Sequence, residues 1–308
     1  MSPMMNRGNT ITAPRNFDFV DFPKQVNTHY IKELKQRLGE FSGIIRLQIK
    51  TVDLLYLGNG FVEYEDKKGI SSRSMTENKK AVIPGSAVKG AIRHVARAIS
   101  DGCIPNEKDL NLPRELKLKC KPTASKEEPL HICIVCDMFG AMGLGSKISI
   151  SDFTSECCET KQCNVPAQFS PNINSDFYKE NGCHIGYKFY YTNCESRSML
   201  RQSTTIYAIP KGTVFTGDIH FHGLDKTELQ LLMHSLGIGG EYFSHKLGGY
   251  RADGFGTVNF TCIGFILNGK ECTPAEAVDL ACQYVDSCSD DCYDRISLLR
   301  QLMTFRKE

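Results

Sequence analysis

The chain has 308 residues, 41% of them hydrophobic, and its formal net charge at pH 7 is only +2. This length suffices for one large domain or two small ones, and no apolar run is long enough to span a membrane. The small net charge excludes a generally basic nucleic-acid coat, so any nucleic-acid site must be a local patch.

The N-terminal part of the chain predicts few regular elements. Residues 1–15 are polar and lack the apolar stretch of a signal peptide, so we expect a cytoplasmic protein. A short helix is expected near Asn27–Leu38, inside an N-terminal extension of residues 1–43. A first strand is predicted at 44–56, and residues 57–80 are expected to form a loop.

Residues 81–97 predict a strand followed by a basic helix over 85–100. The apolar run ends at Pro84-Gly85, and Ser86 is a good N-cap candidate. The predicted apolar face consists of Val88, Ala91, Ile92, Val95, Ala96 and Ile99. A second stripe, of cations four residues apart, consists of Lys89, Arg93 and Arg97. Such a stripe is typical of a solvated face, but like charges repel, so an anionic partner is the second interpretation.

The cysteine pattern predicts a metal site. Without an export signal, the 14 cysteines favour thiols or metal ligands over disulfides. A CxxC knuckle and two preceding cysteines supply four soft ligands, which suit tetrahedral zinc: Cys103, Cys120, Cys133 and Cys136. Structural zinc would stabilise the polar insertion at 101–138. His131 is the alternative to Cys103 as fourth ligand, and thiols without metal are the alternative to zinc.

After a predicted strand at 147–153, residues 154–204 form an excursion rich in Ser, Asn and Pro. A second set of soft ligands there lacks standard zinc-finger spacing: Cys157, Cys158, Cys163, Cys183, His184 and Cys194. The stretch Tyr187–Tyr191 alternates rings with a lysine, which is typical of an ordinary strand but also of a surface that stacks on bases. Arg197 and Arg201 follow as candidate contacts to a nucleic-acid backbone.

The next part of the chain predicts a strand after Lys211-Gly212, with Val214, Ile219 and Phe221 buried or half-buried. A helix is expected over Asp225–Leu236, with Asp225 as its N-cap. Another strand begins at Thr257. Two helices are expected near the C-terminus, at Thr273–Tyr284 and Asp294–Arg306.

A glycine-rich loop at 246–256 lies between the helix predicted over Asp225–Leu236 and the strand that begins at Thr257. It carries cations and rings among four glycines: Lys246, Tyr250, Arg251 and Phe255. Glycine lets a backbone approach a ligand closely. Phosphate prefers Arg or Lys, and an unstacked base prefers a flat ring. A plain hairpin turn is the alternative interpretation.

The order of these motifs resembles the RAMP superfamily over roughly residues 44–265. The motifs are IPGSAVKGAIR, CIVCDMFG, SISDF, IPKGTVFTGDIHF and LGGYRADGFGTV. More narrowly, the chain is similar to backbone (Cas-seven-type) subunits of type III or type VII CRISPR effector complexes. The resemblance implies an α+β fold with a ferredoxin-like, RRM-related βαββαβ core at 44–265. It also implies a zinc insertion at 101–138, a thumb at 154–204 and C-terminal helices at 266–308.

The resemblance further implies the function and the partners. Such subunits bind guide CRISPR RNA, pair it with complementary target RNA, and polymerise as copies of themselves beside other effector subunits. The residues that we expect to contact RNA are Ser86, Lys89, Arg93, Arg97, Arg197, Arg201, Lys246, Tyr250, Arg251 and Phe255. No membrane partner is expected.

One departure from the family pattern argues against cleavage of the target RNA by this chain. Relatives that cut RNA carry an essential aspartate before the PGS motif, where this chain has Ser71-Ser72. A serine cannot replace a carboxylate as metal ligand or general base, so we expect a non-cleaving scaffold served by a separate nuclease. The alternative is a metal-dependent endoribonuclease subunit of a type III complex, with Asp66 as the candidate carboxylate and magnesium as its cofactor.

Overall fold

The computed structural model describes residues 16–304 apart from short segments. Outside the description within that range are residue 32 and residues 66–68, 78–79, 106–109, 118–119, 121–129, 157–158, 167–172, 193–202 and 240–242. Helices and strands are mixed along the chain, which confirms the predicted α+β class. Among the described residues, no helix is both long enough and apolar enough to cross a bilayer.

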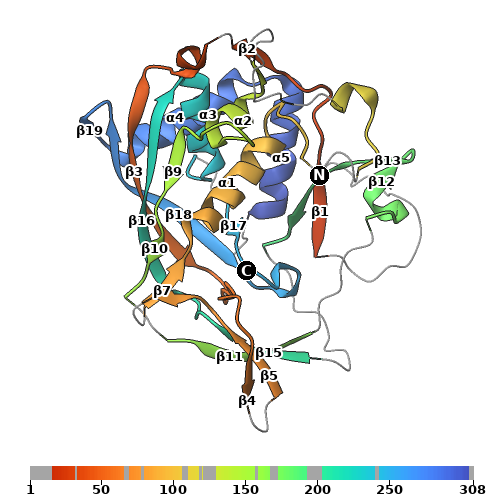
Figure 1. Cartoon of the computed structure of the whole chain (residues 1–308), viewed down its shortest axis with the longest axis vertical. Helices are drawn as coiled ribbons and strands as arrows, with labels where there is room; N and C mark the ends of the chain where they lie inside the picture. Colours follow the sequence, from red (N-terminus) through yellow and green to blue (C-terminus); the bar gives the residue numbers. More distant parts are fainter. Residues whose placement is uncertain are drawn as a thin grey trace.

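A large antiparallel sheet runs along the left side of the molecule in Figure 1. Its strands follow the order β17 (His245–Lys246), β18 (Thr257–Leu267), β3 (Phe41–Thr51), β16 (Val214–Leu224), β10 (Phe153–Thr154), β7 (Lys80–Ile83) and β6 (Thr76–Glu77). In addition, β9 (Ile148–Ile150) pairs with β16, and β19 (Lys270–Cys272) pairs with β18. Alternate side chains of β3, namely Ile45, Leu47 and Ile49, are fully buried, so one face of the sheet lies against the core.

Helices pack against this sheet and against one another. The helix α1 (Gly85–Ala98) contacts β9, α3 (Lys226–Ser235) contacts β16, and α4 (Pro274–Ser287) contacts β18. Beside them lie α5 (Asp290–Met303) and the short α2 (Ile134–Phe139) (Figure 1). Five of the six residues predicted for the apolar face of α1 are buried, and Ala91 is half-buried.

The predicted N-cap of α1 is wrong, because Ser86 is exposed and the helix begins at Gly85 after Pro84. The Gly85 amide donates instead to Asp152 Oδ1 over 2.7 Å. A Cβ at Gly85 would lie 2.3 Å from the Ile150 carbonyl oxygen, so only glycine lets the helix start this close to β9.

The elements of the second half largely agree with the sequence. Asp225 caps α3 as predicted, because its side chain accepts from the Glu228 amide over 2.8 Å and Glu228 accepts in return from the Asp225 amide. The strand after Gly212 is β16, with Ile219 and Phe221 buried. Val214 is 37% exposed, which corrects its predicted burial; Phe215 takes the inward position.

A separate four-stranded sheet lies at the lower end of the molecule in Figure 1. Its order is β11 (Lys161–Pro166), β15 (Ser203–Ala208), β5 (Gly69–Arg73) and β4 (Glu63–Glu65). The prediction of a loop at 57–80 is therefore wrong, because β5 runs parallel to β15 and pairs with it. The strand β11, which lies inside the predicted excursion at 154–204, pairs with β15 and so joins the same sheet as β5.

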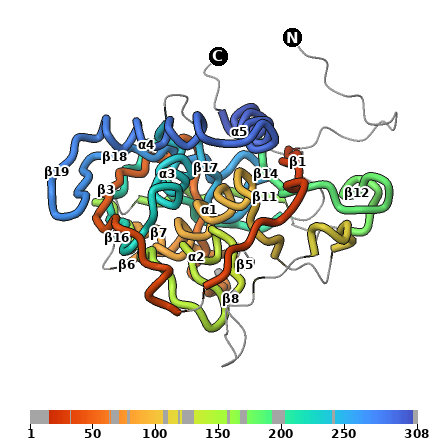
Figure 2. The backbone as a smooth tube through the Cα atoms, turned by 90° about the horizontal axis from the view of Figure 1, so that it is seen from above, coloured from red at the N-terminus to blue at the C-terminus, as the bar shows by residue number. Residues whose placement is uncertain are grey.

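The N-terminal segment is also built into the fold. The strand β1 (Phe17–Asp21) pairs with β14 (Gly186–Tyr190), and both strands contact α5 (Figure 2). The strand β2 (His29–Ile31) pairs with β8 (Leu130–Ile132). The helix expected near Asn27–Leu38 is thus wrong except for one 3₁₀ turn, η1 (Leu34–Arg37). A small hairpin of β12 (Lys179–Glu180) and β13 (Cys183–His184) completes the strands.

Candidate functional site

The first candidate site is a cluster of four cysteines. The sulfur atoms of Cys103, Cys120, Cys133 and Cys136 all lie within 4.8 Å of one another. Cys133 is the N-cap of α2 and Cys136 lies in its first turn, while Cys103 follows α1 and Cys120 comes from the insertion. Four converging thiols match the tetrahedral sulfur set that zinc prefers, so this cluster could hold a metal ion.

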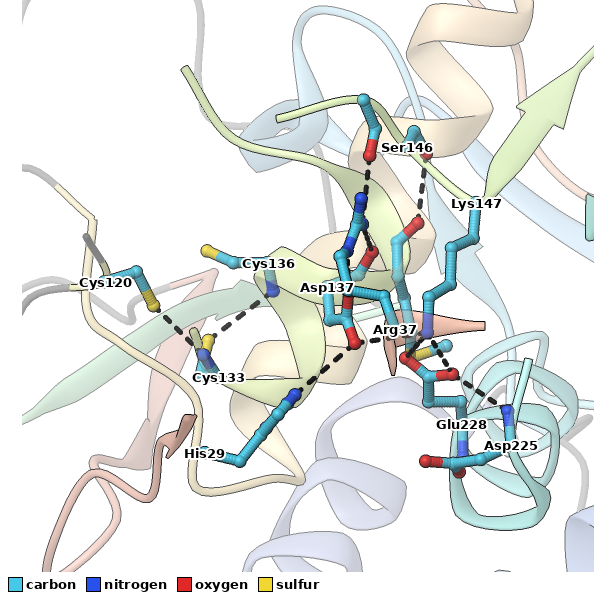
Figure 3. Close-up of polar contacts among 12 residues, drawn as sticks. His29, Arg37, Cys120, Cys133, Cys136, Asp137, Ser146, Lys147, Asp225 and Glu228 are labelled. Atoms are coloured by element: carbon cyan, nitrogen blue, oxygen red, sulfur yellow. Dashed lines mark hydrogen bonds and ion pairs between the residues drawn. The ribbon is translucent and has the colours of Figure 1, made fainter. Parts of the chain in front are cut away.

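The thiols strongly perturb one another. Hydrogen bonds with Cys103 and the other thiols lower the pKa of Cys133, whereas the bond with Cys103 raises the pKa of Cys120. The Cys133 amide donates to Cys120 Sγ over 3.1 Å, and the Cys136 amide donates to Cys133 Sγ over 3.5 Å (Figure 3). Thiols this close cannot all ionise together without a cation, and a divalent metal would supply that charge.

The other predicted metal ligands do not join the cluster. The His131 ring packs against Tyr30 with centroids 3.8 Å apart, so the geometry favours Cys103 as fourth ligand. Both ring nitrogens of His184 are engaged, one by the Asn111 amide and the other by the Ile173 carbonyl. Within the described residues no second cluster forms; Cys157, Cys158 and Cys194 lie outside them.

A buried charge network adjoins the cysteines, and sequence reasoning missed it (Figure 3). Asp137, the residue after Cys136, accepts from Arg37 Nε over 2.5 Å and from Lys147 Nζ over 3.1 Å. Lys147 also donates to Glu228 Oε2 over 2.7 Å, and His29 Nε2 lies 3.4 Å from the Asp137 carboxylate. Burial alone would raise the pKa of Asp137, but the bonds from His29, Arg37 and Lys147 hold it below its ordinary value.

The second candidate site is a groove of about 520 Å³ between α1, β14, β17 and the glycine-rich loop. The side of the groove formed by α1 presents small residues, Ala87, Gly90 and Ala91. A Cβ at Gly90 would meet nothing within 4 Å, so a ligand can approach the helix backbone there. In the glycine-rich loop, Gly248 has a φ of +76°, and a Cβ at this position would clash with the Tyr56 carbonyl.

Cations and rings line the same groove. The Arg251 guanidinium lies 4.9 Å from the centroid of the Tyr190 ring. The Lys188 Nζ lies 4.9 Å from the same centroid, but it is closer to Phe17, at 3.7 Å, and donates to the Tyr178 hydroxyl over 3.2 Å. Arg251 is exposed, whereas Lys246 is buried and donates to the Phe255 carbonyl over 3.1 Å. The stretch Tyr187–Tyr191 thus has both predicted characters: Tyr187 and Phe189 are buried in a strand, and Lys188 and Tyr190 line the groove.

The remaining candidates from the glycine-rich loop are less accessible. Phe255 is buried in a small apolar cluster with Val165 and Ile206. Tyr250 adopts the left-handed conformation, with a φ of +56°, and its ring packs 5.5 Å from that of Tyr56. Arg197 and Arg201 lie outside the described residues.

The basic stripe of α1 is largely engaged inside the chain. Lys89 Nζ donates to Ser146 Oγ over 2.8 Å and to the Ile148 carbonyl over 2.7 Å, and burial lowers its pKa. Arg93 donates to the Gly140 carbonyl over 2.7 Å. Arg97 is half-buried, and its Nε has no hydrogen-bond partner among the described residues. A contact of this stripe with RNA therefore stays a prediction.

Ser71 and Ser72 both lie in β5. Ser71 is fully buried. Ser72 Oγ donates to the Phe61 carbonyl over 2.9 Å and accepts from the Tyr56 hydroxyl over 2.7 Å. Both residues thus belong to strand packing, and the candidate carboxylate Asp66 lies outside the described residues.

The chain matches a known protein family. A sequence profile of the RAMP superfamily matches residues 48–259, more than half of the chain. The matched range contains α1, the cysteine knuckle, β16, α3 and the glycine-rich loop. Comparison with curated proteins gives no significant match.

Proposed function

Because the chain belongs to the RAMP superfamily, we propose that it is a guide-RNA-binding subunit of a CRISPR effector complex. Membership of this superfamily is consistent with a CRISPR-associated role in RNA binding. The finer proposal is a backbone (Cas-seven-type) subunit of a type III or type VII complex. Its partners would be guide RNA, complementary target RNA, further copies of itself and other effector subunits.

The observation that carries the proposal is the groove beside α1. It combines the exposed Arg251 and the Lys188 ammonium with the Tyr190 ring. Cations hold phosphates and rings stack on bases, which together are the ordinary means of binding single-stranded nucleic acid. The helix side of the groove is open at Gly90, so a sugar-phosphate backbone has room to lie along it.

The strand order supports a ferredoxin-like core. The four strands β18, β3, β16 and β10 are adjacent in that order. Along the chain, α1 lies between β3 and β10, and α3 lies between β16 and β18. This is the βαββαβ connection with the first and third strands central, so we propose that β3, α1, β9–β10, β16, α3 and β18 form that core.

We propose that the subunit holds the guide–target duplex without cutting it. Ser71 and Ser72 supply no carboxylate for magnesium, and the Ser72 hydroxyl is already hydrogen-bonded within the chain. A separate nuclease subunit would then cut the target. We further propose that the four-cysteine cluster holds structural zinc, which would tie the insertion to α1 and α2.

Substitution of the groove cations tests the proposal. In Lys188→Ala plus Arg251→Ala, we expect weaker binding of single-stranded RNA, because two cations no longer neutralise phosphates. The slope of log affinity against log salt should fall by about 0.7 for each phosphate that is no longer neutralised. Lys270→Ala, which removes an exposed cation from β19, is the matched control and should change neither quantity. Unchanged affinity and slope in the double variant would contradict this assignment of the groove.

A further inference from the structure

The exposed large apolar side chains of the described residues are concentrated at two ends of the molecule. Seven of these eleven side chains belong to two groups, which we call the upper patch and the lower patch. The upper patch consists of Tyr30, Leu34, Leu38 and Met142, and the lower patch consists of Phe61, Val62 and Tyr64. Single exposed apolar residues are ordinary on a protein surface, whereas groups of them mark interaction sites.

The upper patch is formed by three segments that contact one another. Tyr30 lies on β2, and Leu34 and Leu38 lie at the two ends of η1, which contacts β2. Met142 lies in the segment between α2 and β9 and is 92% exposed. Arg37 of η1 donates to a backbone carbonyl of that segment over 3.1 Å. These contacts bring the four exposed side chains to one end of the molecule, where β2 is labelled in Figure 1.

The lower patch lies on an open edge strand at the opposite end of the molecule. Phe61 and Val62 directly precede β4, and Tyr64, which is 78% exposed, lies within it. Among the described strands β4 pairs with β5 alone, and β2 of the upper patch pairs with β8 alone. Figure 1 places β4 and β2 at opposite ends of the longest axis. Open edge strands with exposed apolar side chains are templates for pairing with another chain.

We propose that the upper patch of one copy of this chain binds the lower patch of the next copy. This inference rests on the proposed function, which includes copies of the chain as partners, and it names the two surfaces through which they meet. Two different apolar patches at opposite ends of one chain suit a head-to-tail contact, in which every added copy leaves one patch of each kind free. A two-fold dimer, by contrast, needs only one self-complementary patch.

The size of the patches agrees with a second copy as the occupant. An aromatic side chain covers about 150–250 Å², so three or four large exposed side chains supply roughly 400–500 Å² of apolar surface. A specific interface buries about 800 Å² on each partner, and a little over half of that area is apolar. Each patch therefore supplies the apolar part of one ordinary interface, with polar neighbours as its rim.

Sedimentation velocity of the purified protein without RNA, at a series of concentrations, tests the contact. We expect the wild type to form oligomers that lengthen as its concentration rises. Phe61→Ser plus Tyr64→Ser disrupts the lower patch, and Leu34→Ser plus Met142→Ser disrupts the upper patch. Both double variants change only exposed side chains, so the fold is kept, and each variant alone should sediment as a monomer.

The matched control is Ile263→Ser plus Tyr293→Ser. It removes two exposed apolar side chains that belong to neither patch. Since the upper and lower patches stay intact, we expect this variant to associate as the wild type does. Loss of association in this control would show that the contact does not depend on the two patches, and would overturn the inference.

A mixture of the two double variants completes the test. One variant keeps its upper patch and the other keeps its lower patch, so the mixture should form a dimer and no longer species. A dimer of either variant alone would show contact between like patches and overturn the head-to-tail inference. A wild type that is monomeric at every concentration, or variants that associate as the wild type does, would also overturn it. A chain that associates as expected but does not bind RNA would instead contradict the proposed function.

Discussion

Buried histidines give individual residues a measurable effect on stability. Burial lowers the pKa of His234 and of His245 to about 4, from an ordinary value of 6.5. Below pH 6.5 these histidines therefore become protonated in the unfolded chain, whereas in the folded chain they remain neutral. The stability due to each neutral histidine is fully present above pH 6.5 and is lost as the pH falls toward 4.

We predict that the free energy of unfolding, measured by urea denaturation, falls between pH 6.5 and pH 5. Each buried histidine should contribute about 1.4 kcal/mol per pH unit. His234→Gln should remove its share of the slope, whereas His220→Gln, at an exposed position, should leave the slope unchanged. A variant His234→Gln with the wild-type pH dependence would show that this ring is not held neutral.

The cysteine cluster gives a second prediction for a single residue. Cys120→Ser removes one of four ligands, so we expect the purified protein to lose stoichiometric zinc in elemental analysis. Cys282→Ser, on α4 and outside the cluster, is the matched control and should retain it. Wild-type protein without zinc, or Cys120→Ser with full zinc, would contradict the zinc proposal.

Among the elements, α2 connects the four-cysteine cluster to the N-terminal segment. Cys133 and Cys136 define its start, and Asp137 in the same turn holds Arg37 of η1 and His29 of β2. The strand β2 also pairs with β8, directly before the knuckle. Both His29 and Arg37 are therefore held by the same short helix that positions two of the four cysteines.

Substitution of Asp137 tests this connection. Asp137→Asn leaves the Arg37 guanidinium without its anion, whereas Lys147 keeps Glu228. Removal of one partner of a buried ion pair typically costs about 3–5 kcal/mol. We expect a matching decrease in the free energy of unfolding and faster hydrogen exchange over β2 and η1, with zinc retained. Asp286→Asn, exposed on α4, should change neither. Protection of β2 and η1 equal to that of the wild type would contradict the connection.

Elements with local signals were predicted well from the sequence. The Asp225 N-cap of α3, the apolar face of α1 and the cysteine spacing each depend on patterns that can be read along the chain. The strand β5 was missed because it is stabilised by pairing with β15, far away in sequence, and its own residues show no strong alternation. The cap of α1 was misassigned because its partner, Asp152, comes from a distant part of the sequence.

The residues of the candidate site differ in the same way: some are indicated by local sequence patterns and others depend on distant parts of the chain. Lys246, Arg251 and the Tyr187–Tyr191 stretch could be chosen by residue type, and the fold brings them to one groove. The role of Gly90 depends on a groove that no local pattern indicates. Phe255 was expected to face a base, but the fold buries it against β15, because the loop closes onto a small apolar cluster.

For the whole molecule, the central claim is that this chain holds a guide–target duplex without cutting it. The claim rests on the groove beside α1 and on serines where a cleaving relative would supply a carboxylate. It assigns binding and spacing to this subunit and the chemistry to another.

The most direct test incubates guide-loaded protein with end-labelled complementary RNA and Mg²⁺, without any separate nuclease. We predict a stable complex from which the labelled RNA is recovered at full length. Failure to retain the complementary RNA would contradict the RNA-binding role itself. Cuts at regular intervals would contradict the account and would direct attention to Asp66 as the missing carboxylate.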